Sequence, residues 1–254
     1  MLYNHFIIEI SSTNNEKIKK LLSLKEKKTR NMLSLAIIEG EKVVREALAL
    51  GRVKTLVVCK EKAEEFKSAN CEIICVPDFI LKKLSSVEAN QGVVAVIDTK
   101  FASEFKMPSG NFLVLDGVAD PGNLGSLIRS AVAFGFSEIY AIGCVDVFNE
   151  KVLRSASGTF FKVGFVKTDY GGLERIAADN KNYIISADLH GENIKTASLP
   201  KNKNIGIVLG NEGNGVSDEA KKYVQKEVTI PMQNEVESLN VAVSGSAIMF
   251  EISK

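Results

Sequence analysis

The stretch FLVLDGVADPGNLGSLIRSAVAFG, residues 112–135, decides how this 254-residue chain folds. It begins with a run of β-favouring apolar residues, turns at a Pro-Gly pair, and continues as an apolar sequence with helical periodicity. It therefore predicts a strand, a turn and a helix. Alternating strands and amphipathic helices are typical of α/β domains with largely parallel sheets. Ligands of such sheets bind at the carboxyl ends of the strands, so the turns that follow the strands are where a functional site is expected.

The same alternation runs along the whole chain and breaks once, at the polar segment 99–111. We therefore expect two α/β domains, at residues 1–100 and 111–254, joined by a linker at 101–110. The expected strands lie at 35–40, 55–59, 72–76, 92–98, 112–118, 138–143, 183–189, 205–211 and 227–232. The expected helices lie at 17–30, 40–51, 61–69, 77–86, 123–135, 150–158, 171–180, 217–224 and 238–252.

The composition, 45% hydrophobic and 25% charged residues, is that of an ordinary globular protein. No apolar run reaches the ~18 residues of a membrane span, and the first residues do not resemble a signal peptide, so we expect a cytoplasmic protein without a membrane partner. Cys71 and Cys75 are not matched by a second Cys or His pair. Because zinc sites need such a pair, we expect no metal.

Charge is distributed unevenly although the net charge is only +1. Residues 1–109 hold 18 basic and 14 acidic residues, against 14 and 17 in residues 110–254. Much of the basic excess lies in KIKKLLSLKEKKTR, residues 17–30, where apolar residues alternate with seven basic ones and predict one amphipathic helix. This helix is either a solvated face or a surface that contacts nucleic-acid phosphates.

Three turns of the second half carry unusual residues. In the first, Asn123 is expected to cap a helix that carries Arg129 among apolar neighbours. A buried guanidinium must be paired or functional, and the residues alone leave both open. In the second, Gly210, Gly213 and Gly215 surround Glu212 and let the backbone approach a ligand. Their order is not the dinucleotide fingerprint, so a nicotinamide-dependent oxidoreductase is disfavoured.

The third turn, TIPMQNEVESLNVAV, runs from a strand end through a polar loop to a helix of small residues. Ser238 and Asn240 stand at the start of that helix. Ser is a common helix N-cap, so capping explains Ser238, but it does not by itself explain Asn240 two residues later. Turns rich in Gly, Asn and backbone amides suit a small polar cofactor, and no Ser-His-Asp set or carboxylate cluster accompanies them.

Taken together, NLGSLIR, LGNEGNG and IPMQNEVESLN resemble the three motifs of the SpoU (TrmH-like) RNA ribose methyltransferases, members of the SPOUT class. The resemblance covers the second half and implies a trefoil-knotted methyltransferase domain, an exception to the rule that chains do not thread loops. It also implies S-adenosylmethionine as cofactor, rRNA or tRNA as substrate, a homodimer, and transfer of a methyl group to a ribose 2′-hydroxyl. The first half is similar to the smaller α/β RNA-binding domain of many members.

The resemblance also assigns roles to residues of this chain. It implies that Asn123, Arg129, Glu212, Ser238 and Asn240 are catalytic. It implies that Leu209, Gly210, Ile230, Met232 and Leu239 bind the cofactor. RNA is then expected to contact Lys19, Lys20, Lys27 and Lys28 of the basic segment together with Lys151 and Arg154.

Two positions depart from the family pattern, and one rival function stays open. Asn234 stands where the family has Gly, and Glu150 stands where it often has Pro. Asn tolerates left-handed backbone better than most residues, so the loop around Asn234 is expected to survive. The rival is a non-catalytic RNA-binding or ribosome-assembly factor that keeps the fold. No residue pattern identifies the RNA or the nucleotide.

Overall fold

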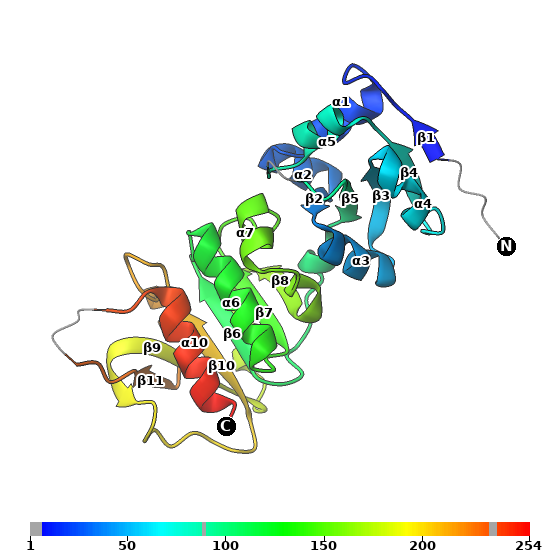
Figure 1. Cartoon of the computed structure of the whole chain (residues 1–254). Coiled ribbons are helices and arrows are strands. Elements are labelled where there is room, and N and C mark those ends of the chain that lie inside the picture. The colour runs from blue at the N-terminus through cyan, green and yellow to red at the C-terminus, as the bar shows by residue number, and fades with distance from the viewer. Residues whose placement is uncertain (1–6, 88–89, 234–237) are drawn as a thin grey trace. The chain divides into compact units, whose positions relative to one another are not determined.

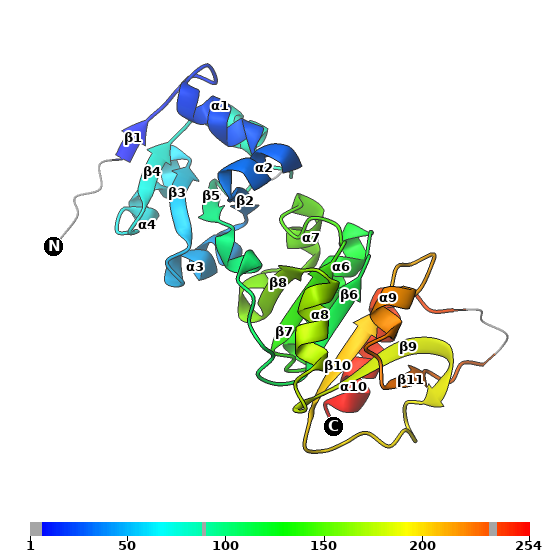
Figure 2. The same ribbon diagram turned by 180° about the vertical axis from the view of Figure 1, so that it is seen from behind.

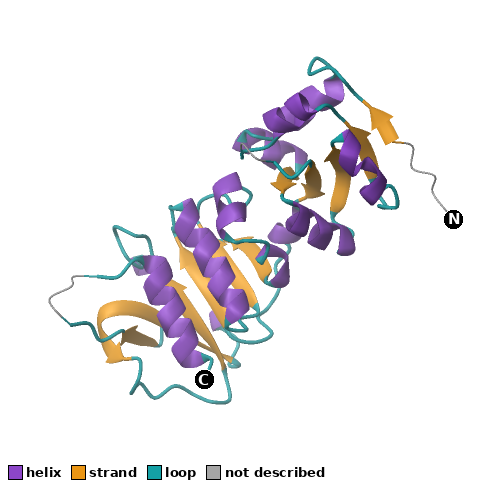
Figure 3. Cartoon of the chain, viewed as in Figure 1, coloured by secondary structure: helices purple, strands orange, loops and turns teal. Residues whose placement is uncertain are grey.

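The computed structural model describes residues 7–87, 90–233 and 238–254, so Asn234 lies outside the described residues. The chain forms two compact units that divide between Lys100 and Phe101 (Figure 1). Each unit is built on its own sheet with its own helices (Figure 3).

The first unit has a five-stranded sheet in the order β1-β4-β3-β5-β2. Its elements are β1 (Ile7–Glu9), α1 (Glu16–Ser23), α2 (Lys27–Leu33), β2 (Leu35–Glu39), α3 (Glu41–Ala49), β3 (Val53–Val58), α4 (Ala63–Phe66), β4 (Glu72–Cys75), α5 (Asp78–Leu84) and β5 (Val93–Asp98). Strand β4 is parallel to β1 and β3, but β5 is antiparallel to β2 and β3. The expectation of a largely parallel sheet is therefore wrong for this unit, and β1 was not predicted.

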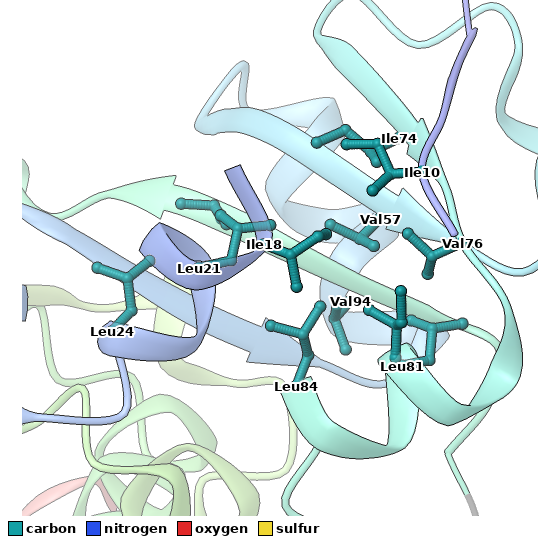
Figure 4. Packing of buried hydrophobic residues seen from close by; sticks show 12 residues of the cluster. Ile10, Ile18, Leu21, Leu24, Val57, Ile74, Val76, Leu81, Leu84 and Val94 are labelled. Atoms are coloured by element: carbon teal, nitrogen blue, oxygen red, sulfur yellow. The ribbon is translucent and has the colours of Figure 1, made fainter. Parts of the chain in front are cut away.

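Helices α1 and α5 cover one face of this sheet with a shared apolar cluster (Figure 4). Ile18 and Leu21, one turn apart on α1, pack with Leu81 and Leu84 of α5. Val57 of β3 lies beneath them and is fully buried. This three-residue spacing buries one face of α1 and leaves its lysines on the other.

The basic segment forms two helices, so the prediction of one helix is wrong. Helix α1 ends at Ser23, and α2 begins at Lys27. Between them, the guanidinium of Arg30 donates hydrogen bonds to the carbonyls of Leu24 (2.9 Å) and Lys25 (2.7 Å). Because these carbonyls at the end of α1 have no helical partner, the buried Arg30 stabilises the corner.

The second unit has a six-stranded sheet in the order β11-β9-β10-β6-β7-β8, and every pair is parallel, as expected. Its elements are β6 (Phe112–Asp116), α6 (Pro121–Ala133), β7 (Glu138–Ile142), α7 (Glu150–Ser155), β8 (Gly164–Thr168), α8 (Tyr170–Ala177), β9 (Asn182–Asn193), β10 (Asn204–Leu209), α9 (Asp218–Lys221), β11 (Lys226–Thr229) and α10 (Val241–Ile252). Strand β8 was not predicted.

Helices cover both faces of this sheet. Helices α6 and α10 lie on the face seen in Figure 1, and α8 and α9 lie on the face seen in Figure 2. Gly245 brings α10 close to the sheet, because a Cβ there would stand 2.6 Å from Leu209 of β10 and 2.7 Å from Leu127 of α6. The last helix therefore packs directly above the strand that leads into the glycine-rich turn.

The segment expected to be a linker, 101–110, belongs to the second unit. The ring of Phe101 lies 6.0 Å from that of Phe148 and 5.9 Å from that of Phe160. Farther along, Tyr140 donates a hydrogen bond to the carbonyl of Lys106 (2.7 Å). The connection between the units is therefore shorter than the polar composition of this segment indicates.

Candidate active site

The start of α6 is fixed by Asp120 rather than by Asn123. Asp120 is the N-cap and accepts a hydrogen bond from the backbone N–H of Asn123 (2.8 Å), and Pro121 opens the helix. The prediction that Asn123 caps α6 is therefore wrong. Asn123 is the third residue of the helix, and its side chain is left free for other contacts.

The glycine-rich turn after β10 is closed by Asn211. Asn211 and Gly215 exchange two backbone hydrogen bonds of 2.9 Å, while the Asn211 amide donates to the carbonyl of Gly117 (2.9 Å). A Cβ on Gly210 would stand only 2.0 Å from the Gly215 carbonyl carbon. Gly210 is therefore required by the turn's own backbone, and not only by the close approach of a ligand that the sequence predicts. Asn211 was not predicted as a site residue.

Glu212 joins this turn to the start of α6. Its Oε1 accepts hydrogen bonds from the Asp120 N–H (3.0 Å) and the Asn123 amide (2.9 Å), and its Oε2 accepts one from the Ala119 N–H (3.1 Å). Burial raises the pKa of this carboxyl, but the hydrogen bonds from Asn123 and the backbone outweigh it and hold the pKa below its usual 4.5. Glu212 is therefore a charged hydrogen-bond acceptor at neutral pH.

The third turn is attached to the same point. Asn240 is the N-cap of α10, with its Oδ1 accepting from the N–H groups of Ala242 (2.9 Å) and Val243 (3.3 Å). Its amide Nδ2 donates to Oδ1 of Asn123 at 2.9 Å. Ser238 lies two residues before the cap, so it does not begin the helix as expected. Glu212, Asn123 and Asn240 thus form one hydrogen-bonded chain across three segments that are far apart in sequence.

A pocket of about 680 Å³ opens beside this network. All five residues expected to bind the cofactor line it: Leu209, Gly210, Ile230, Met232 and Leu239. Glu212, Ser238 and Asn240 also line it, whereas Asn123 and Arg129 do not. Asn123 lies behind the lining and holds Glu212 and Asn240 in place.

Arg129 lies apart from this pocket and is exposed on α6, so the expectation of a buried or half-buried guanidinium is wrong. Leu127, Ile128 and Ala131 on the same helix are fully buried and face inward. Within the described residues, Arg129 makes no hydrogen bond or ion pair, so the structural ion pair that the sequence left open is not formed there.

The residues expected to contact RNA are exposed in both units. Lys19, Lys20, Lys27 and Lys28 lie on the outer faces of α1 and α2, and Lys19 pairs with Glu16 (2.7 Å). Lys151 and Arg154 lie on α7, which is held against α6 by a hydrogen bond from Ser155 Oγ to the Gly122 carbonyl (3.0 Å). Glu150, the departure from the family's Pro, begins α7 after the cap Asn149.

Five further residues line the pocket and were not predicted: Ala187, Asp188, Leu189 and His190 of β9, and Lys221 of α9. Of these, Asp188, His190 and Lys221 carry ionisable groups. The strand that the sequence predicts at 183–189 ends before His190. Only the register of β9 against its neighbour, which a single sequence does not display, brings the segment to the pocket.

Residues 7–87, 90–233 and 238–254 contain no group of three or more His, Cys, Asp or Glu side chains that could hold a metal ion. The same residues contain no helix whose length and apolar content would let it span a bilayer.

Known proteins resemble the chain in sequence and in structure. The SpoU rRNA Methylase family matches residues 110–250, and the MRM3-like substrate binding domain matches residues 15–95. The 23S rRNA (guanosine(2553)-2'-O)-methyltransferase RlmP of Bacillus subtilis is 28% identical, over 96% of this chain and 98% of its own length. An AdoMet-bound rRNA methyltransferase from Sinorhizobium meliloti has a TM-score of 0.87 at 26% identity, over 96% of this chain and 97% of that chain. A putative RNA methyltransferase of the TrmH family from Porphyromonas gingivalis has a TM-score of 0.85 at 30% identity, over 94% of this chain and 98% of that chain.

Proposed function

The chain belongs to the SpoU rRNA methylase family, and from this premise we propose that it transfers a methyl group from S-adenosylmethionine to a ribose 2′-hydroxyl of rRNA. The observation that carries the proposal is one pocket lined by the glycine-rich turn after β10, by the segment after β11 and by the start of α10. RlmP of Bacillus subtilis, which the chain matches over 98% of its length, is named for the same reaction on 23S rRNA. The MRM3-like match in the first unit supports RNA as the substrate.

The pocket fits this cofactor. Its volume of about 680 Å³ lies in the range of small-molecule sites. Leu209, Ile230, Met232 and Leu239 offer apolar contacts for the adenine ring, and backbone groups around Gly210 offer hydrogen bonds to its edges. When bound, the cofactor supplies an electrophilic methyl group on a good leaving group. The task left to the chain is to place the ribose oxygen in line and to stabilise its developing negative charge.

Asn123, Glu212, Ser238 and Asn240 are proposed to position the ribose. Because the Asn123 amide donates to Glu212 and its carbonyl accepts from Asn240, its orientation is fixed from both sides. Asn240 is in turn fixed by the N–H groups of α10. Such a preorganised polar site costs little reorganisation during the reaction.

Arg129 is proposed to act as a cation rather than as a base, because guanidinium stays protonated in proteins. Since it does not line the pocket of its own chain, we propose that it serves the pocket of a second copy. Exposed apolar residues of α10 support such a homodimer: Val243 is 54% exposed and Phe250 is 51% exposed.

Two further proposals concern the knotted path of the chain and the cellular compartment of the protein. We propose that the second unit contains the family's trefoil knot, which is supported by the way the segments after β10 and β11 line a single pocket. We propose the cytoplasm as its location, because the proposed substrate is rRNA and Cys59, Cys71, Cys75 and Cys144 are free thiols.

The test is methyl transfer to ribosomal RNA. Purified protein is incubated with isotopically labelled S-adenosylmethionine and with ribosomal subunits or free 23S rRNA, and the digested RNA is analysed by mass spectrometry. We expect one labelled 2′-O-methylnucleoside. RNA and cofactor binding without any transfer would favour the non-catalytic RNA-binding factor, and label on a base would contradict ribose methylation.

A further inference from the structure

Four of the unpredicted lining residues come from a five-residue excursion of β9. Against β11, Ser186 pairs with Glu227, but the next pair is Glu192 with Val228, so residues 187–191 have no counterpart on β11. A Cβ on Gly191 would stand 2.6 Å from the backbone of Glu227 and Val228. Gly191 therefore lets the excursion return tightly to the sheet, which fixes where its tip projects.

Asp188 is held within this excursion with part of its carboxylate unused. Its Oδ1 accepts a hydrogen bond from the His190 N–H (2.9 Å), an arrangement that sets the side-chain direction. Its Oδ2 has no partner among the residues that the structure describes. The pocket therefore has a negative group on the β9 side whose orientation is fixed.

Lys221 supplies the opposite charge from a different element. It ends the short helix α9 and lines the same pocket. Its ammonium makes no ion pair or hydrogen bond with any described residue, whereas its neighbour Lys222 pairs with Glu219 at 2.6 Å. Among the described lining residues Lys221 is the one lysine or arginine. An unpaired cation in a pocket wall indicates a site for an anionic group.

We propose that Asp188 and Lys221 together bind the amino-acid end of the cofactor, Asp188 its α-ammonium and Lys221 its α-carboxylate. This inference rests on the proposed function, which puts S-adenosylmethionine in the pocket. The amino-acid end is a zwitterion, so it is complementary to a pocket whose lining offers one carboxylate oxygen and one ammonium without partners among the described residues. The apolar lining residues and Gly210 are then left for the adenosine end.

An RNA phosphate is the other anion that Lys221 could meet. The charges of the lining favour the zwitterion, because Asp188 and Glu212 both line the pocket and would repel a phosphate. A zwitterion is attracted by both kinds of group, because the carboxylates attract its ammonium and Lys221 attracts its carboxylate.

Two neutral or near-neutral ligands test the proposal by calorimetry. S-adenosylhomocysteine keeps the amino-acid end and lacks the sulfonium charge, and 5′-methylthioadenosine lacks the amino-acid end. We expect Lys221→Gln to weaken S-adenosylhomocysteine binding roughly tenfold, because a charge-assisted hydrogen bond is lost, and to leave methylthioadenosine binding unchanged. Asp188→Asn should behave alike, because Asn keeps an acceptor for the His190 N–H and removes only the charge.

Lys222→Gln is the matched control, since it removes a neighbouring positive charge that is already paired outside the pocket. It should change neither affinity. Equal losses for both ligands, or no loss for either, in Lys221→Gln and Asp188→Asn would overturn the proposal. Weaker RNA binding with unchanged S-adenosylhomocysteine affinity would also overturn it and make Lys221 a phosphate contact. Wild-type protein that binds neither ligand would instead contradict the proposed cofactor.

Discussion

The two units position their candidate functional side chains in different ways. In the first unit, the four lysines proposed to contact RNA lie on neighbouring helices, and helical periodicity alone turns them outward. In the second unit, Glu212, Asn123 and Asn240 come from segments up to 117 residues apart and hold one another by hydrogen bonds. Substitutions in the first unit should therefore change charge with little effect on structure, while most of those in the site should change structure and function together.

Arg129 is the exception in the second unit, because its substitution should change function without changing structure. It should give the largest effect of all, on the rate of methyl transfer. It is exposed and has no partner among the described residues, so Arg129→Ala should change the free energy of unfolding by less than about 0.5 kcal/mol. Single-turnover methyl transfer with saturating RNA and cofactor should nevertheless slow about 10²- to 10³-fold, because a cation at the developing oxyanion is lost. Arg129→Lys should also be slow, since it loses the planar fork. A wild-type rate for Arg129→Ala would remove this residue from the mechanism.

Gly210 gives the next largest effect and tests whether the turn is structurally constrained. Gly210→Ala should destabilise the fold by about 1–3 kcal/mol, because the added Cβ meets the backbone of Gly215 and Val216. Gly213→Ala is the control, since its Cβ would stand 3.6 Å from Asn211, an ordinary contact. Urea unfolding measures the stability of both variants, and calorimetry should show weaker cofactor binding for Gly210→Ala. Equal stability of the two variants would mean that the turn adapts.

The basic surface of the first unit tests the other half of the comparison. Replacing Lys19, Lys20, Lys27 and Lys28 with Gln should reduce the magnitude of the slope of log K for RNA against log salt by up to about 3.6, because each phosphate contact contributes about 0.7 to 0.9. Cofactor affinity and the free energy of unfolding should stay unchanged. Lys54→Gln with Lys67→Gln, on exposed positions of the same unit, is the control. An unaltered slope in the fourfold variant would leave these lysines as a solvated face.

The smallest effect concerns the charge of Glu212. Its pKa is lowered in the folded protein, so its contribution to stability is fully present above the unfolded value of 4.5 and is lost as pH falls through the lower folded pKa. Glu212→Gln should therefore cost more stability at pH 7 than at pH 3.5. Urea unfolding of both proteins at the two pH values measures this, and a cost that grows at low pH would contradict it.

Much of the second unit could be predicted because its strands are short apolar runs followed by periodic helices. Strand β8 was missed because only Phe165 and Val166 of GFVKT are buried, which is too short a signal. Arg129 was misplaced because its sequence neighbours are apolar, yet at 100° per residue it points away from Leu124, Leu127 and Ile128. The cap at Asp120 was readable, since Asp before Pro is a common helix start.

Other features depend on pairings that one sequence does not display. The excursion of β9 follows from its register with β11, and the contact between Asn123 and Asn240 follows from the order of strands in the sheet. The resemblance grouped these two residues, but it did not say that one amide binds the other. In the first unit, the reversed direction of β5 was hidden because a buried antiparallel strand has the same apolar composition as a parallel one.

The hydrogen bond between Asn123 and Asn240 also bears on how the protein is made. Ribosomes add about 5–20 residues per second, so the 117 residues between these partners take about 6 to 23 s to synthesise. During that interval Glu212 can acquire its contacts with α6, but Asn123 lacks its second partner and the pocket lacks the wall that Ser238 and Leu239 provide. The proposed cofactor site is therefore incomplete until α10 has been synthesised, so a cofactor that binds there does not guide the earlier steps of folding.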